Sequence, residues 1–183
     1  MILGKFRSVV GIGLVFGLLG GAAMALENAG FEVPDQGASS FTYTPAGATW
    51  SFVGGGGLSG PNGPWKCDST SPDPLGDQFA YLQGAASVLQ NLDGLIAGAI
   101  YGLSFYESYR TAMLPENDLS VILDEGLGTE QSIYTVSSVS NATWELRQTD
   151  EFVAAKASYT LTFRTTHPLG TGDRTTIIDG VVT

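Results

Sequence analysis

The side chains in this sequence that could carry out acid–base chemistry are few, and their spacing does not pair them. Hydrolysis of a glycosidic bond requires two carboxylates that face each other across a cleft, and eliminative cleavage requires a base such as His or Tyr beside a group that neutralises charge. The acids in strand-like segments are Glu107, Asp124, Glu145 and Glu151. Glu107 lies near the end of its segment, where it could border a cleft, but no partner acid stands at a matching spacing. These acids therefore predict no catalytic pair.

The remaining reactive side chains are the single cysteine, Cys67, and the single histidine, His167. A thiol nucleophile needs a base within hydrogen-bonding reach, whereas His167 lies far along the chain and is followed by a proline. A lyase-like set of His167 with Tyr109 or Arg110 would form only if two distant loops meet. The sequence therefore favours a non-catalytic protein, with a small glycoside hydrolase or polysaccharide lyase as the less favoured alternative.

Recognition of hydroxyl groups is the chemistry that the strand-like segments support better. In residues 101–110, alternation separates an apolar face from a polar face that carries Tyr106 and Arg110. In residues 78–84 the same alternation points Tyr81 away from the core. Outward rows of Tyr, Gln and Arg offer donors and acceptors on a rigid sheet and suit a hydroxyl-rich ligand, although an ordinary solvated sheet face has the same composition.

Trp65 differs from the other two tryptophans in its surroundings. Trp50 and Trp144 fall in alternating segments and are expected to pack in the core. Trp65 lies in the Gly- and Pro-rich stretch GPNGPWKCDST, where its ring could stack on the apolar face of a sugar or could pack as a lid over one open end of the fold. The predicted ligand-binding residues are Trp65, Tyr81, Tyr106 and Arg110.

About nine short segments rich in β-branched and aromatic residues must position these side chains. The segments read TYTPAGATWSFVG, QFAYLQG, ASVLQNL, AIYGLSFYESYR, DLSVILD, QSIYTVSSV, TWELRQTDEFV, ASYTLTFRTTH and DRTTIIDGVV. Turn-forming stretches separate them, among them GGGG at 54–57, SGPNGP at 59–64 and SPDPLGD at 71–77. No apolar stripe of helical period competes with this pattern. It predicts an all-β fold, an antiparallel β-sandwich of jelly-roll or immunoglobulin-like topology.

The N-terminal residues have the composition of a bacterial secretory signal peptide. Lys5 and Arg7 form a basic start, residues 9–22 are apolar, and Ala-Met-Ala follows at the position of cleavage. Residues 1–25 are therefore expected to be removed, with a retained membrane anchor as the alternative. Residues 26–183 fit one domain and contain no further segment that could span a membrane. We expect a secreted protein, extracellular or periplasmic.

The charge of the chain limits its partners. The sequence has 18 acidic and eight basic residues, and loss of Lys5 and Arg7 leaves six basic residues in the mature chain. Such a surface repels phosphate backbones, which argues against nucleic acid. Carboxylates are also the hard oxygen ligands that calcium takes. Because Cys67 cannot form an intramolecular disulfide, the exported domain must be held by its core, with a metal as a possible addition.

Several stretches resemble a known family in their order and spacing. They are ENAGFEVP, YTPAGATWSFVGGGGLSG, DPLGDQFAYLQGAASVLQNL, YGLSFYESYR, LSVILD and TLTFRTTHPLGTGDRTTIIDGVVT. Over essentially the whole mature chain, the sequence resembles the galactose-binding-like jelly roll of bacterial secreted proteins and is similar to the carbohydrate-binding modules of β-sandwich type. The resemblance implies a secreted, non-catalytic carbohydrate-binding-like module with a polysaccharide or glycan partner. The fold also hosts matrix proteins, so an extracellular matrix or surface protein that binds other proteins is the alternative.

The resemblance further implies a structural calcium ion that joins the first and last strands. Members of the family begin with N-G-x-F-E, where this chain reads NAGFE, and end with an I-D-x-V strand. Carried over by position, the ligands are the Glu32 and Asp179 carboxylates and the Gly30 carbonyl. Alternation places Asp179 on the same face as Ile177 and Val181, where an unpaired carboxylate would be costly, so a metal or buried hydrogen bonds should compensate it.

Overall fold

In the computed structural model, the residues described are 26–70, 76–111, 117–167 and 173–183, and every regular element among them is a β-strand. The strands are β1 (Phe41–Tyr43), β2 (Ser51–Ser59), β3 (Phe79–Asp93), β4 (Ile100–Tyr101), β5 (Ser104–Tyr109), β6 (Asn117–Leu123), β7 (Gln131–Val139), β8 (Glu145–Gln148), β9 (Phe152–Val153), β10 (Ser158–Thr166) and β11 (Thr175–Val182). These described ranges contain no helix that could cross a membrane. The all-β prediction is confirmed, and the predicted signal peptide lies outside the described residues.

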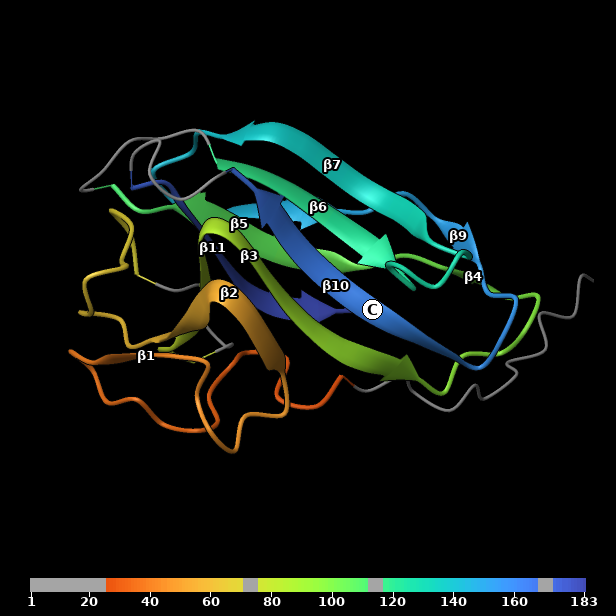
Figure 1. The fold of residues 1–183 in the computed structure, drawn as a ribbon, viewed down its shortest axis with the longest axis horizontal. Helices are drawn as coiled ribbons and strands as arrows, with labels where there is room; N and C mark the ends of the chain where they lie inside the picture. The colour runs from red at the N-terminus through yellow and green to blue at the C-terminus, as the bar shows by residue number, and fades with distance from the viewer. Residues whose placement is uncertain (1–25, 71–75, 112–116, 168–172) are drawn as a thin grey trace, which may run out of the picture.

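Two curved layers form the sandwich, and every strand pair in it is antiparallel (Figure 1). The strand order is β7-β6-β10-β3-β11-β5-β8, with β2 paired to β3 and β1 paired to β2. Residues 85–93 of β3 pair with β10, whereas residues 80–83 pair with β11. The two halves of β3 therefore belong to opposite layers, and this strand joins them.

Glycines allow β2 and β3 to pass from one layer to the other. Gly84 in β3 has φ +61°, and Gly54 in β2 has φ +67° beside a register shift. A Cβ atom on Gly55 would lie 2.3 Å from the Gln83 carbonyl oxygen. The sequence interpretation of GGGG as a turn, and of residues 78–92 as two strands, is wrong because glycine accommodates the bend without ending the strand.

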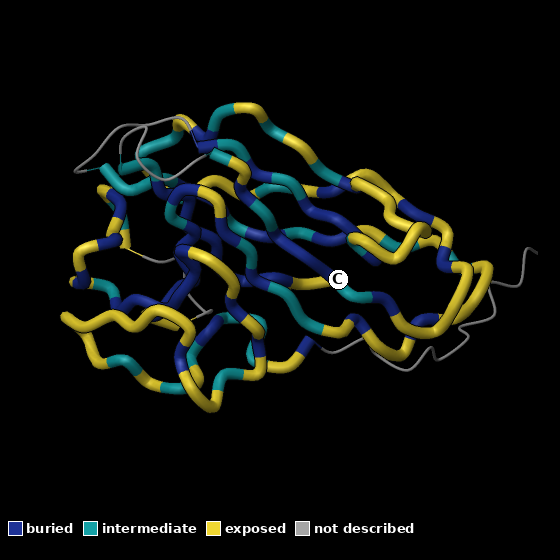
Figure 2. Tube along the Cα trace, viewed as in Figure 1, coloured by how far each residue is buried: buried dark blue, intermediate teal, exposed yellow. Residues whose placement is uncertain are grey.

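The main core lies between the two layers, as the buried stretches in Figure 2 indicate. Leu82, Phe105 and Phe163 are fully buried there, and Trp50 is 2% exposed, as predicted from alternation. A second, smaller cluster covers the outer face of β3 and β11. It consists of Trp65, Cys67, Phe79, Tyr81 and Ile177, with Trp144 packed against it.

The N-terminal segment is ordered by contacts with the opposite end of the chain. Phe31 has φ +58° and is fully buried, and the Asn28 side-chain amide exchanges hydrogen bonds with the Val33 backbone at 2.8 and 3.1 Å. The Val181 N–H donates to the Ala29 carbonyl at 3.0 Å. A backbone hydrogen bond thus joins the NAGFE segment to the last strand.

Candidate ligand-binding site

A group of aromatic and polar side chains gathers on the outer face of β3, beside β1. We call it the β1 aromatic cluster; its members are Phe41, Tyr43, Trp65, Tyr81, Gln83, Arg110 and Asp173. Tyr81 points outward because its neighbours in β3, Ala80 and Leu82, belong to the main core. Three of the four predicted ligand-binding residues therefore lie together.

Trp65 and Tyr81 form the buried base of the cluster. Their rings stack with centroids 4.6 Å apart and 13° between planes, and the Arg110 guanidinium carbon lies 4.4 Å from the Trp65 centroid. The Tyr81 ring and the Arg110 guanidinium therefore both cover the Trp65 indole. Trp65 is 5% exposed and Tyr81 is fully buried. The expectation of an exposed Trp65 platform is wrong, because the ring packs as a lid on the sheet.

The exposed rings of the cluster belong to β1. Phe41 is 39% exposed and Tyr43 is 40% exposed, and their rings meet edge to face at 5.8 Å. Both rings also contact Trp65 edge to face. Sequence analysis missed this pair because β1 is only three residues long and reads as the start of a longer segment. The signal was the alternation in Phe-Thr-Tyr, which places both rings on one side.

A chain of hydrogen bonds fixes the polar side chains beside these rings. The Tyr43 hydroxyl donates to Gln83 Oε1 at 2.6 Å, and Gln83 Nε2 donates to Asp173 Oδ1 at 2.8 Å. Arg110 Nη1 donates to Asp173 Oδ2 at 2.5 Å. Burial, followed by the nearby Asp173 charge, raises the pKa of Tyr43 against the opposing effect of Arg110. The hydroxyl therefore stays protonated and remains a donor at neutral pH.

Buried polar atoms that lack a hydrogen-bond partner are concentrated in this cluster. Among the residues described, seven buried side-chain atoms have no partner, and three of them are Trp65 Nε1, Tyr81 Oη and Arg110 Nε. Buried donors of this kind are normally satisfied by an ordered water or a ligand oxygen. Gly57 leaves the space for the hydroxyl, since a Cβ atom there would lie 2.4 Å from Tyr81 Oη.

Tyr106, the fourth predicted ligand-binding residue, lies away from the cluster. It is on β5, opposite Asp179 in the register, and about 13 Å from Arg110 along the strand. In the part of the chain that the structure describes, no ring contact or hydrogen bond joins Tyr106 to the cluster. Its role in ligand binding stays a prediction without support from this geometry.

Glu32, one of the predicted calcium ligands, precedes β1 in the chain, and its half-buried side chain lies beside the start of β3. Its Oε1 atom accepts a hydrogen bond from the Gln78 N–H at 2.7 Å. Burial raises the pKa of Glu32, the bond from Gln78 opposes this change, and the nearby Asp77 and Asp35 charges add to it. Within residues 26–183 as described, no group of three or more His, Cys, Asp or Glu side chains lies close enough to hold a metal ion.

Asp179, the second predicted carboxylate ligand, is fully buried, and its Oδ1 atom accepts from the Gly180 N–H at 2.7 Å. Gly180 has φ +58° at a register shift in β11. The shift places Val181 in the main core, whereas Ile177 belongs to the outer cluster. The prediction that Asp179 and Val181 share a face is wrong for this reason. The assignment of calcium to Gly30, Glu32 and Asp179 stays a prediction.

Glu107 does not border a cleft, although its place near the end of a strand-like segment allowed that interpretation. It is fully buried, and it accepts hydrogen bonds from Arg147 Nε at 2.6 Å and from the Tyr134 hydroxyl at 3.1 Å. Arg147 also binds both oxygens of Glu145 at 2.9 and 2.8 Å. One arginine therefore bridges the two glutamates across the neighbouring strands β5 and β8 of one layer, which is an arrangement for a structural ion pair and not for a catalytic pair.

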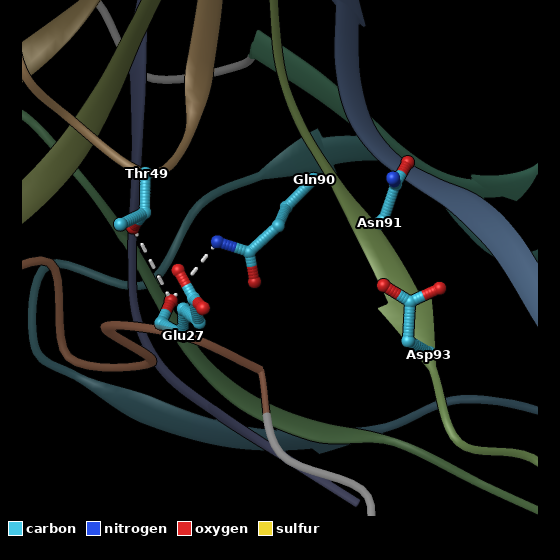
Figure 3. Close-up of a pocket in the computed structure, with 5 residues that line it drawn as sticks. All are labelled: Glu27, Thr49, Gln90, Asn91 and Asp93. Carbon is cyan, nitrogen blue, oxygen red and sulfur yellow. Dashed lines mark hydrogen bonds between the residues drawn. The ribbon is translucent and has the colours of Figure 1, made fainter.

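Two hollows elsewhere on the surface lack aromatic side chains. The polar pocket in Figure 3 has a volume of about 420 Å³ and is lined by Glu27, Thr49, Gln90, Asn91 and Asp93. Gln90 Nε2 donates to the Glu27 carbonyl at 3.0 Å across it. A shallow hollow of about 430 Å³ over β2, β3 and β10 is lined by Val53, Ala85, Ala86, Ser87, Arg164, Thr165 and Thr166. Of these three surfaces, only the β1 aromatic cluster combines exposed rings with fixed polar groups.

Comparison with known proteins identifies the fold. No protein-family profile and no curated protein matches the sequence. Among solved structures, TmCBM61 in complex with β-1,4-galactotriose matches with a TM-score of 0.52 and 15% identity, covering 88% of this chain and 97% of that one. The fold is the β-sandwich jelly roll of carbohydrate-binding modules.

Two further structures support this carbohydrate-binding-module fold. The CBM22-1 xylan-binding domain from Paenibacillus barcinonensis Xyn10C matches with a TM-score of 0.50 and 15% identity, covering 79% of this chain and 93% of that one. The K2 cleaved adhesin domain of Lys-gingipain matches with a TM-score of 0.54 and 10% identity, covering 84% and 94%. The jelly-roll alternative of the sequence prediction is thereby confirmed over the immunoglobulin-like one.

Proposed function

We propose that this protein is a non-catalytic glycan-binding module and that the β1 aromatic cluster is its ligand face. The observation that carries the proposal is the exposed pair Phe41 and Tyr43 beside a polar network whose geometry is already fixed by hydrogen bonds. Sugars bind to proteins through two kinds of contact, stacking of their apolar C–H face on an aromatic ring and hydrogen bonds to their hydroxyls. The cluster offers both on one surface.

Two of the three similar structures support a polysaccharide partner by what they are named for. These two are named for a galactotriose complex and for xylan binding, and the third is an adhesin domain. The hydrogen bonds of the polar network also hold the Tyr43 and Gln83 side chains in place before a ligand binds. A preorganised site loses less side-chain entropy on binding.

The proposal includes export and a structural calcium ion. Residues 1–25 have the composition of a signal peptide, and a glycan-binding module would meet polysaccharides outside the cell. The calcium ion would be held by Glu32, the Gly30 carbonyl and Asp179. Its support is the full burial of Asp179 and the accumulation of negative charge around Glu32 from Asp35 and Asp77.

The test of the ligand face is glycan-array binding and isothermal titration with the purified protein and two alanine variants. Tyr43→Ala and Phe41→Ala should each weaken binding by about tenfold, or about 1.4 kcal/mol, because each removes an exposed stacking ring. Leu146→Ala is the matched control, since Leu146 is 52% exposed on β8. Absence of any glycan ligand, or equal affinity of Tyr43→Ala and Leu146→Ala, would remove the proposal.

A further inference from the structure

We propose that the β1 aromatic cluster selects uncharged sugars over sugars that carry carboxylate or sulfate groups, and that Asp173 is the residue that sets this selectivity. The inference rests on the proposed glycan-binding function. It concerns the chemical class of the ligand and follows from how the charges within the cluster are paired.

Arg110, the cation of the cluster, already forms an ion pair with Asp173. Arg110 Nη1 lies 2.5 Å from Asp173 Oδ2, and the side chains of this pair are only 12% and 29% exposed. An ion pair that is partly removed from water is screened less than a surface pair. An anionic sugar would have to displace Asp173 from Arg110 while lying close to the Asp173 charge. The local charge available to such a ligand is therefore zero or negative.

The remaining contacts of Arg110 hold it in this position. Its guanidinium carbon lies 4.4 Å from the centroid of the Trp65 ring, a cation–π geometry. Turning the guanidinium outward toward an anion would break this contact as well as the ion pair. The Arg110 side chain is therefore held in place against the buried base of the cluster, and it is not free to move outward and bind a ligand carboxylate.

The carboxylate of Asp173 is the more exposed end of the pair and is itself fixed. It accepts hydrogen bonds from Gln83 Nε2 at 2.8 Å and from the Thr175 hydroxyl at 3.3 Å. An ionised carboxylate can only accept, so its remaining capacity suits a ligand hydroxyl that donates. Neutral sugars present several such donors, whereas a ligand carboxylate or sulfate presents acceptors alone.

The charge of the whole chain acts in the same direction. The 18 acidic residues outnumber the eight basic ones, so an anionic polysaccharide is repelled before it reaches the cluster. This effect falls with salt, whereas the local effect of Asp173 persists because the pair is partly buried. Measurements at two salt concentrations therefore separate the two contributions.

The experiment is a comparison of four immobilised polysaccharides, β-1,4-galactan, xylan, polygalacturonate and a sulfated galactan, at low and high salt. The wild-type protein should bind at least one neutral polymer at least tenfold more tightly than either anionic polymer at both salt concentrations. Asp173→Asn should reduce this ratio by about tenfold, because it frees Arg110 for an anionic group and removes the repelling charge.

Asp93→Asn is the matched control, since it removes one exposed negative charge outside the cluster. Arg110→Gln is the second variant, used if Asp173→Asn does not fold; it leaves the Asp173 charge without its cation and should raise the preference for neutral over anionic polymers. Equal or tighter wild-type binding to an anionic polymer overturns the selectivity but keeps the glycan-binding function. An equal shift in the ratio for Asp93→Asn overturns the role of Asp173. Binding to none of the four polymers removes both proposals.

Discussion

At the scale of single residues, Glu107 places a carboxylate in the interior between the two layers. It is fully buried, and its charge partner is Arg147, whose side chain is 29% exposed. Burial raises the pKa of Glu107 above its ordinary value of 4.5, and the hydrogen bond and charge of Arg147 oppose this rise. The stability of this part of the fold therefore depends on a single guanidinium.

We expect Arg147→Ala to lower the free energy of unfolding at pH 7 by about 3–5 kcal/mol, because it leaves a buried carboxylate without a counter-charge. Without Arg147 the folded-state pKa of Glu107 rises further above the unfolded value. The folded state then binds the proton more tightly, so stability falls as pH rises from about 4.5 through the folded-state pKa. Urea unfolding should accordingly show partial recovery of the variant between pH 7 and pH 5.

Glu145→Gln is the control for this prediction. It removes the exposed partner of Arg147 but keeps the contact with Glu107, so the change should stay within about 1 kcal/mol. If Arg147→Ala and Glu145→Gln unfold at the same urea concentration at pH 7, the buried pair contributes nothing and the interpretation of Glu107 is wrong.

At the scale of elements, the strands that cross between layers contain backbone positions that only glycine can occupy. Gly54 has φ +67°, and a Cβ atom there would lie 2.6 Å from the Ala85 carbonyl oxygen. Both the conformation and the close approach to β3 exclude a side chain. This position ties the bend of β2 to the bend of β3, so a substitution should affect both layers at once.

We expect Gly54→Ala to destabilise the protein by about 2 kcal/mol or more, from the left-handed backbone and from the steric contact with Ala85 together. The measurement is the midpoint of denaturant unfolding. Gly102→Ala is the matched control, since its nearest atom would be 3.9 Å away and its φ is not positive. A difference below about 0.5 kcal/mol between the two variants would show that β2 can straighten without cost.

The sequence predicted the strands well where alternation is regular and poorly where a strand bends. Periodicity assigned Leu82, Phe105 and Phe163 to the core because a sheet buries every second residue. The sequence pattern divided β3 at Gly84 and treated the glycines of β2 as a turn. A glycine in the sequence looks the same whether its left-handed backbone ends a strand or bends it. Local sequence does not distinguish these two cases.

At the scale of the whole molecule, the candidate site depends on contacts between segments that are far apart in the sequence. Asp173 binds Gln83 across 90 residues and Arg110 across 63 residues. Arg110 and Tyr81 could be selected from alternation, but the partnership with Asp173 and the exposure of Tyr43 follow from the strand order. The burial of Trp65 likewise depends on where its loop lies over β3. Such features are properties of the topology, and sequence spacing does not contain them.

The contact between residues 26–34 and the last strand provides the remaining test at this scale, since the Val181 N–H donates a hydrogen bond to the Ala29 carbonyl. A calcium ion held by Glu32 and Asp179 would close the same junction, and a ligand present at one hundred times its dissociation constant stabilises a fold by about 2.7 kcal/mol. For a domain of this size that corresponds to a fall of about 5–10 °C in melting temperature when a chelator removes the ion. Asp179→Asn should melt at a temperature that the chelator does not change, whereas Asp93→Asn should keep the full shift. If the calcium-replete wild type shows no shift, Asp179 is compensated by hydrogen bonds such as that from Gly180, and no ion contributes to the contact between residues 26–34 and β11.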